Sequence, residues 1–371
     1  MKRSSLVALL ISLFFIYLFV FNPAPGAWYR GEATMAQAFL ATRVDWPTVG
    51  RLLLHLKWLP FTGALGFLIL SLVVRAWRWQ LIARPLDRVP LDRMFHLTNL
   101  GYMANNLLPM RLGEVLRAGA LGLRSQVPVA GALATIVLER MMDMIGALSV
   151  LVLMVLMQGD LLEAAGAASP EALGALDRFR SLAPLLATGA GLGLAFLLLL
   201  VLFRERSLVL SEALLTRFLP ARPAARLHRL FATFSSGLEI LRSPWEALLL
   251  LAQTSLLMGC YLASLACMVH AYGLHQEMAL FGQAPFASLL MLLVFVSLGY
   301  MIPAAPGAFG TVQYFTALAM GLIGAGAEEA TSFALGNHLI TWLVLTVLGL
   351  VALPFLRLRF SDVMQWKESG P

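Results

Sequence analysis

The sequence predicts an all-α, polytopic membrane protein with six full spans and two broken re-entrant helical hairpins, arranged as an inverted-topology repeat. Hydrophobic residues make up 60% of the 371 residues and charged residues only 13%, against about 45–50% and about 25% in soluble domains. Apolar runs of about 20 residues, the length that crosses a bilayer, recur along the chain. Polar breaks that contain Pro and Gly divide two further apolar stretches. These three observations exclude a soluble globular protein.

Six apolar segments are long enough to cross the hydrocarbon core as helices, at about 20 residues for each crossing. The first follows Lys2 and Arg3 and resembles a signal peptide, but its apolar core exceeds the usual range of about 7–15 residues, so we expect an uncleaved helix. The predicted spans are residues 5–21, 58–75, 128–157, 181–203, 245–271 and 331–353.

Two more apolar stretches, residues 94–124 and 285–324, are split by polar breaks at residues 105–114 and 303–310. Each half is about 14–17 residues long, which as a helix is shorter than a hydrocarbon core of about 30 Å. We therefore expect two hairpins that enter the membrane and turn back. The alternative is two unrelated polar kinks in a helical bundle, since Gly and Pro are common in membrane helices.

The basic residues indicate orientation rather than nucleic-acid binding, although the formal net charge is +7, because they occur in short stretches between apolar runs. Residues 75–93 carry five arginines against two aspartates, and residues 204–243 carry seven arginines against three glutamates. Acidic residues dominate 158–180 and 325–330. The positive-inside rule then places the first two stretches and both termini in the cytoplasm, with the chain in the inner (cytoplasmic) membrane of a bacterium.

The order of these segments predicts an inverted repeat. Residues 1–157 form the first membrane repeat, and residues 158–180 an outer connector. Residues 181–353 form the second repeat, which includes a cytoplasmic amphipathic segment at 204–243, and residues 354–371 form a cytoplasmic tail. Each repeat reads span, span, hairpin, span, but they begin on opposite sides. Interrupted segments at corresponding positions of two repeats are typical of a transport site.

Charged side chains at membrane depth cost about 2.5–3.5 kcal/mol each to insert, so each is expected to have an oppositely charged partner or a functional role. Arg111, Glu114 and Arg117 are three residues apart, which on a helix places each within reach of the next. They begin the second half of the first hairpin, where free N–H groups and the helix dipole favour an anion such as phosphate. We expect this group to bind substrate.

Glu139, Arg140 and Asp143 form a second charged group within a predicted span. Their spacing allows a local ion pair. Together with Arg111, Glu114 and Arg117 they sum to zero formal charge. The alternative to a binding role is that the two groups pair with one another and hold the first hairpin against its neighbouring helix.

Polar and Pro/Gly residues at the two breaks complete the candidate substrate site. Asn105 and Asn106 are expected to cap the first break or to bind a head group. The second break leaves backbone groups without helical partners, which is tolerated where they line a wet cavity. Its candidate residues are Pro303, Pro306, Gly307, Gly310 and Gln313.

Catalytic signatures are not found in the sequence. It contains no HExxH, GxSxG or P-loop motif and no spacing typical of a metal site, so we expect neither a cofactor nor a bound metal and no enzymatic activity. Cys260 and Cys267 lie in one apolar run and predict no disulfide framework.

Three motifs in series resemble the lysylphosphatidylglycerol synthase transmembrane region family, a flippase-like integral membrane domain. They are NLLPMRLGEVLR at residues 106–117, ERMMD at residues 139–143 and PAAPGAFG at residues 303–310. The resemblance covers roughly residues 58–353 and implies movement of a lipid across the bilayer. No soluble aminoacyl-transferase domain accompanies these motifs, so lipid aminoacylation is not expected.

The sequence therefore favours a transporter of an anionic phospholipid or a polyprenyl-phosphate-linked lipid, with lipid phosphate head groups as its partners. One alternative is a lipid-modifying enzyme or subunit, such as a polyprenyl-phosphate sugar transferase, for which Glu32 and Asp45 are the available acids in the first outer loop. A scaffold for lipid-synthesis enzymes is another. A homo-oligomer is compatible with each reading.

Overall fold

The computed structural model describes residues 3–163 and 243–358, except positions 22, 24, 43, 109, 110, 126, 128, 158, 303 and 304, together with a few positions between 185 and 220. Within these residues the secondary structure is helical, and an isolated bridge between Phe21 and Thr42 is the sole β-type pairing. The predicted all-α membrane fold is confirmed. Most of the predicted span 181–203, of the amphipathic segment 204–243 and of the connector 158–180 lies outside the described residues.

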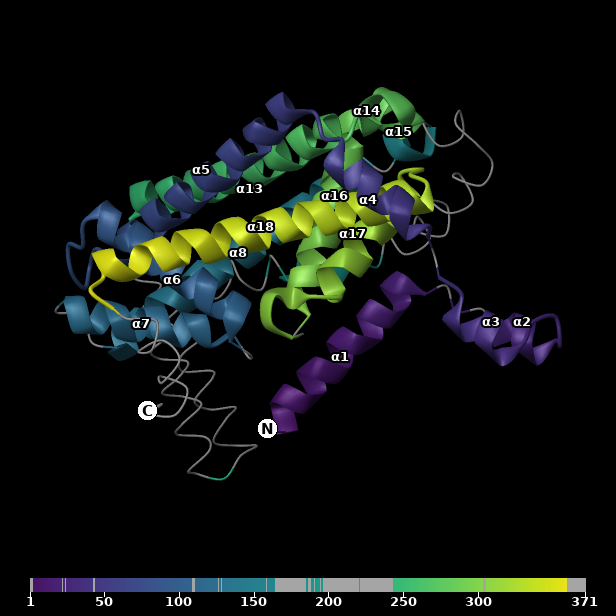
Figure 1. Ribbon diagram of the computed structural model, residues 1–371. Helices are drawn as coiled ribbons and strands as arrows, with labels where there is room; N and C mark the ends of the chain where they lie inside the picture. Colours follow the sequence, from purple (N-terminus) through teal and green to yellow (C-terminus); the bar gives the residue numbers. More distant parts are fainter. Residues whose placement is uncertain are drawn as a thin grey trace.

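Three helices are long and apolar enough to cross a membrane: α5 (Trp58–Ala83), α13 (Pro244–Ala271) and α18 (Ala327–Phe355). At 26 to 29 residues they are about 40 Å long. α13 begins sharply, because the Ser243 hydroxyl accepts the Glu246 N–H and Pro244 needs no partner in the first turn. α5 and α13 lie side by side along most of their length (Figure 1).

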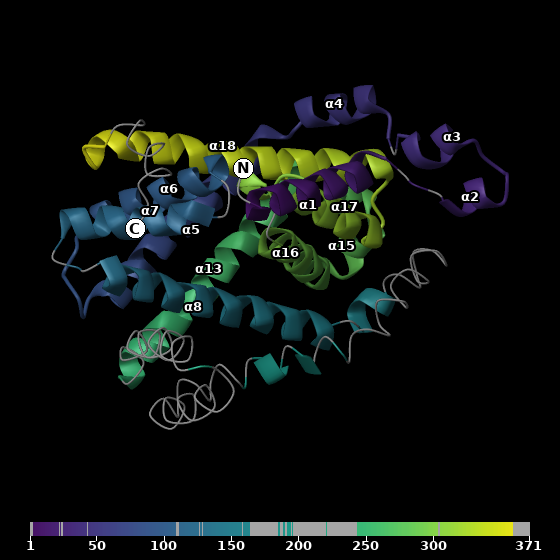
Figure 2. The same cartoon turned by 90° about the horizontal axis from the view of Figure 1, so that it is seen from below.

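Two further helices fall on predicted spans. α1 (Arg3–Val20) is a shorter apolar helix. α8 (Val129–Leu156) has 28 residues, but three charged residues interrupt its apolar run. α8 packs against α13 and α16 (Pro285–Met301), and Figure 2 shows it crossing α13. The number of membrane crossings stays a prediction.

The expected end of the second span at residue 75 was wrong. α5 continues to Ala83, and Arg75 and Arg78, which the charge count had assigned to a cytoplasmic loop, are 7% and 0% exposed. The helix persists because Ala76 and Trp79 continue its buried face. Arginines counted as solvated loop charges are therefore interior residues, which makes the positive-inside rule unreliable for this segment.

The first broken segment is a helical hairpin, as the sequence predicts. α6 (Leu91–Leu107) and α7 (Leu112–Arg124) pack against each other on either side of the break. Gly101 permits the close approach, because a Cβ there would lie 3.2 Å from the Gly113 carbonyl oxygen and 2.8 Å from Cδ of Arg117.

The second broken segment is also a hairpin. α16 is followed by the short 3-10 helix η3 (Pro306–Ala308) and by α17 (Thr311–Leu322), which packs along α16. Gly299 has the role that Gly101 has in the first hairpin, since a Cβ on it would lie 2.7 Å from Cα of Val312. Gly310 has a φ of 91°, a conformation that favours glycine.

The two hairpins meet at the middle of α18. In the first hairpin, the Asn106 amide donates to the Trp342 carbonyl and the Thr346 hydroxyl, both at 3.1 Å. In the second, the Gly307 carbonyl lies 2.8 Å from Nε2 of His338. The tips of both hairpins therefore contact the central turns of a helix that is long enough to span the membrane.

The hairpins approach this point from opposite ends of α18. The His96 ring, near the start of α6, stacks on Phe355 at the C-terminal end of α18, with the ring centroids 4.3 Å apart. α17 instead ends at Leu322, shortly before α18 begins at Ala327. This is the relation that an inverted arrangement of the two hairpins predicts.

Short helices lie toward the end of the molecule where α18 begins. They are α2 (Pro25–Tyr29), α3 (Met35–Leu40), α4 (Trp46–Leu54), α14 (Leu274–Glu277) and α15 (Ala279–Gln283). α4 packs on α18, where the Ser332 hydroxyl donates to the Val49 carbonyl at 3.3 Å, while α2 and α3 project from the helical body (Figure 1).

Candidate functional site

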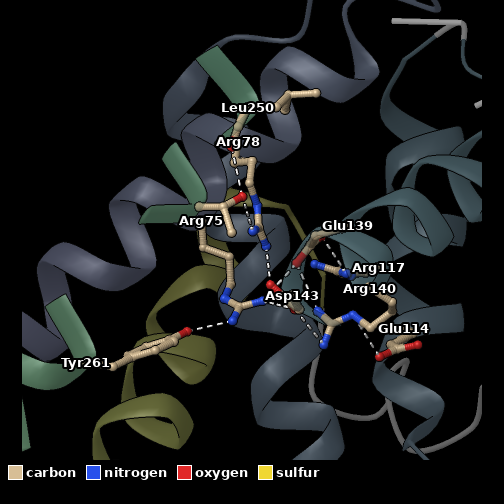
Figure 3. A network of polar contacts seen from close by, with 10 residues as sticks. Arg75, Arg78, Glu114, Arg117, Glu139, Arg140, Asp143, Leu250 and Tyr261 are labelled. Carbon is tan, nitrogen blue, oxygen red and sulfur yellow. Dashed lines mark hydrogen bonds and ion pairs between the residues drawn. The ribbon is translucent and has the colours of Figure 1, made fainter. Parts of the chain in front are cut away.

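Seven charged side chains from three helices form what we call the arginine–carboxylate cluster. α5 contributes two arginines, α7 one arginine and one glutamate, and α8 an arginine and two acids (Figure 3). The hairpin helix α7 is thereby joined to two long helices. The members are Arg75, Arg78, Glu114, Arg117, Glu139, Arg140 and Asp143.

Glu139 is the most enclosed carboxylate of the cluster, with 0% exposure. Its oxygens accept hydrogen bonds from Arg75 at 3.1 Å, Arg117 at 2.9 Å and Arg140 at 2.9 Å. Three guanidinium groups offset the cost of burying this charge. Glu139 thus joins α5, α7 and α8 through one side chain.

Asp143, one helical turn further along α8, also has three arginine partners. Arg75 lies 2.7 Å and Arg140 3.2 Å from its Oδ2, and Arg78 donates to its Oδ1. Because Arg75 and Arg140 each contact both Glu139 and Asp143, the two carboxylates and their arginines form one continuous network.

Glu114 is held much less tightly. Within the described part of the chain it pairs with Arg140 alone, and the separation of 3.6 Å between Oε1 and Nε is too long for a hydrogen bond. Its side chain is 26% exposed, compared with 0% for Glu139.

Neutral side chains orient the arginines. The Tyr261 hydroxyl accepts from Arg75 at 2.6 Å, and the Thr254 hydroxyl accepts from Arg78 at 3.2 Å, so α13 also contributes. The Arg117 guanidinium lies over the Trp79 ring, 4.6 Å from its centroid. Such a cation–π contact stabilises the charge and fixes the plane of the guanidinium.

The cluster has an excess of positive charge. Four arginines face three carboxylates, which leaves a formal charge of +1 among these residues. An uncompensated positive charge is costly in a low-dielectric interior. The arrangement therefore favours the binding of an anion.

Arg111 does not join this cluster, contrary to the expectation that it shares a helix face with Glu114 and Arg117. Arg111 precedes α7 and has a φ of 54°, so its side chain does not lie on the helix face that carries Glu114 and Arg117. The exposed guanidinium instead donates to the Tyr300 carbonyl of the second hairpin. Arg111 is therefore a second positive group, located where the hairpins meet.

The two asparagines stabilise the first break, as the capping alternative anticipates. Asn105 accepts the N–H of Gly113 at 2.9 Å, which satisfies a free donor at the start of α7. Asn106 anchors the tip of the hairpin to α18. Neither contact is evidence of substrate binding.

Hydrogen bonds also shape the second break. Gln313 accepts the Gly310 N–H at 2.7 Å and so caps α17. The Ser12 hydroxyl of α1 donates to the Phe309 carbonyl at 2.7 Å and accepts the Ala305 N–H at 2.8 Å. Of the remaining candidates, Pro306 and Gly307 form η3, and Pro303 lies outside the described residues.

A small hollow adjoins the cluster between α6, α7 and α8. About 170 Å³ of empty space lies within it when its open mouth toward solvent is included, so the enclosed part is much smaller than a typical ligand pocket of roughly 300–1,000 Å³. The lining residues are Thr98, Gly101, Tyr102, Asn105, Glu114, Arg117 and Arg140.

Sequence reasoning missed Arg75, Arg78 and Tyr261. The first two had a usable signal, because Ala76 and Trp79 continue the apolar face of the span beyond residue 75. Tyr261 had none, since a tyrosine in an apolar run is ordinarily a core residue.

The two acids named for an enzymatic alternative have local roles. Glu32 pairs with Arg30 at 2.7 Å, and this hydrogen bond lowers the pKa of Glu32, which disfavours a general-acid role. Asp45 accepts the Thr48 N–H and caps α4. Among the described residues, no group of three metal-ligating side chains occurs.

A model of the lysylphosphatidylglycerol synthase TM region family matches residues 5–349. The match includes both hairpins and all seven residues of the arginine–carboxylate cluster. No curated protein and no solved structure matches the chain.

Proposed function

The chain belongs to the family of lysylphosphatidylglycerol synthase transmembrane regions, and from this premise we propose that it moves an anionic lipid between the leaflets of a membrane. The family makes the chain a multi-pass membrane protein with a lipid-related role. The proposal adds the transport step and the substrate class, a phospholipid or a polyprenyl-phosphate-linked lipid. It also places the protein in a bacterial inner membrane with cytoplasmic termini.

The observation that carries the proposal is the position of the net-positive cluster beside the junction of the two hairpins. The first hairpin contributes Glu114 and Arg117 to the cluster, and its tip contacts the second hairpin through Arg111 and Tyr300. A phosphate crossing the hydrocarbon core needs positive partners at that depth. The hairpin tips contact the central turns of α18. In a helix that spans the membrane, these turns lie near the middle of the hydrocarbon core.

In the proposed mechanism the phosphate head group passes along the hairpin junction while the acyl chains stay in the surrounding lipid. Arginines supply bidentate contacts to phosphate oxygens. The two membrane repeats, residues 1–157 and 181–353, would rock against each other and expose the junction to one side at a time. When no lipid is bound, the three cluster carboxylates offset three of the four arginine charges.

Leaflet exchange in reconstituted vesicles tests this function. Vesicles of phosphatidylcholine with a trace of fluorescently labelled phosphatidylglycerol are prepared with and without the protein, and a membrane-impermeant reductant quenches the outer label. We expect the protein to expose the inner label, with Arg117→Gln reducing the rate at least about ten-fold, because a charged hydrogen bond is worth about 1.5–3 kcal/mol. Exchange no faster than in protein-free vesicles would refute the function.

Labelled phosphatidylcholine provides the matched specificity control. Its head group has the same phosphate but no net charge, so we expect slower exchange than for phosphatidylglycerol. Equal rates for both lipids would contradict selection by the positive cluster. Glu32→Gln is the matched variant control, because its exposed pair with Arg30 lies on the outer segment.

A further inference from the structure

Three buried hydrogen-bond donors around the hollow have no acceptor among the described residues. They are Nε of Arg117, Nε of Arg140 and the hydroxyl of Thr98, all of which belong to residues that line the hollow. Thr98 is 0% exposed. Buried polar groups are almost always hydrogen-bonded, so a concentration of unpaired donors points to a missing acceptor.

Glu114 is the carboxylate that faces one of these donors, but it does not come within hydrogen-bond distance of it. It is 3.6 Å from Nε of Arg140, and its side chain reaches the surface. Glu139 and Asp143 are each held by three arginines and cannot move without breaking the network. Glu114 alone of the three carboxylates can leave at small cost.

Resting on the proposed function, we propose that the hollow is the phosphate site and that Glu114 is an exchangeable counter-ion, displaced from Arg140 when a phosphate group binds. A phosphate oxygen is an acceptor that satisfies the unpaired donors of Arg117, Arg140 and Thr98. Arg140 keeps its ion pairs with Glu139 and Asp143 in both states, so it stays compensated when Glu114 leaves. The ligand is a lipid phosphodiester, and free phosphate shares the recognised chemistry.

Binding of two soluble probes to the purified full-length protein tests the exchange. The probes are glycerophosphoglycerol, which is the head group of phosphatidylglycerol without its acyl chains, and inorganic phosphate, each measured by isothermal titration calorimetry. Glu114→Gln removes the competing charge, so we expect it to bind glycerophosphoglycerol about ten-fold more tightly than the wild type. Glu114→Asp keeps the charge and should bind as the wild type does.

Thr98→Val provides a second variant that does not endanger folding. Because the Thr98 hydroxyl has no partner among the described residues, an isosteric valine removes no hydrogen bond that they make. In the Glu114→Gln background it should weaken glycerophosphoglycerol binding about five-fold, the equivalent of one hydrogen bond, and leave the unfolding midpoint unchanged or higher. Thr135→Val is unsuitable as a control because Trp79 donates to Thr135.

The outcomes separate this inference from the proposed function. Glu114→Gln binding that is unchanged or weaker, with phosphatidylglycerol exchange by the wild type intact, overturns the exchangeable counter-ion and leaves the transport function standing. Absence of exchange by the wild type overturns the function itself. Tighter binding of inorganic phosphate without any binding of glycerophosphoglycerol would overturn the assignment to a lipid head group.

Discussion

At the residue scale, the three carboxylates of the cluster differ in how deeply they are buried and in how many arginines they contact. Glu139 is buried with three arginines, while Glu114 is partly exposed with one distant arginine. Removing one member of a buried ionic network leaves its partners uncompensated, which costs more than the net contribution of the pair. We therefore expect Glu139 to hold the helices together and Glu114 to take part in binding.

This difference predicts the effect of Glu139→Gln on stability. The neutral amide leaves Arg75, Arg117 and Arg140 without a shared counter-ion, so we expect a loss of about 3–5 kcal/mol in the free energy of unfolding. Chemical unfolding of the detergent-purified protein, followed by far-UV circular dichroism, measures it. Glu32→Gln is the control and should leave the unfolding midpoint unchanged. An unaltered midpoint for Glu139→Gln would show that the cluster does not hold these helices together.

At the element scale, each hairpin depends on close contact between its two halves. Gly101 in α6 and Gly299 in α16 are the contact points. A side chain at Gly299 would collide with the backbone of α17, and one at Gly101 would collide with the Arg117 side chain and crowd the Gly113 carbonyl. Small residues at such positions allow membrane helices to pack closely. The breaks are also held from outside, by α18 through Asn106 and His338 and by α1 through Ser12.

Gly299→Ala is expected to separate α16 from α17. The added methyl group would lie 2.7 Å from Cα of Val312, and backbone atoms cannot yield cheaply, so we expect a loss of about 1–3 kcal/mol in stability, typical of overpacking. Gly259→Ala in α13 is the matched control, since nothing lies within 4 Å of a Cβ there. Thermal unfolding compares the two variants. A similar midpoint for both would contradict the close contact.

At the scale of the whole molecule, the lengths of the apolar runs and the placement of the breaks predicted most of the architecture. Long apolar runs predicted α8, α13 and α18 to within a few residues, and the Pro/Gly breaks predicted both hairpins. This works because a lipid environment requires helices, and helices need about 20 apolar residues to cross. The domain boundaries, the two repeats and the substrate stay predictions.

The candidate site was predicted only in part. The spacing of Glu139, Arg140 and Asp143 identified the charged group of α8, because charges at membrane depth stand out in an apolar run. Arg75 and Arg78 were assigned to solvent, since a basic residue at the end of a span reads equally well as a loop charge. Contacts between distant segments, such as Arg75 with Tyr261, leave no local pattern.

The account as a whole depends on relative movement of the two repeats at the hairpin junction, and reversible cross-linking tests this most directly. The test uses a chain in which Cys260 and Cys267 are replaced by alanine. Asn106→Cys in the first hairpin and Thr346→Cys in α18 are introduced together, because Nδ2 of Asn106 lies 3.1 Å from Oγ1 of Thr346. A bis(methanethiosulfonate) cross-linker, which attaches through reducible disulfides, is added to reconstituted vesicles, exchange is read by albumin extraction of short-chain labelled lipid rather than by a reductant, and each single-cysteine variant serves as control. We predict that phosphatidylglycerol exchange stops on cross-linking and returns on reduction. Exchange that continues at the same rate in a fully cross-linked protein would contradict the account.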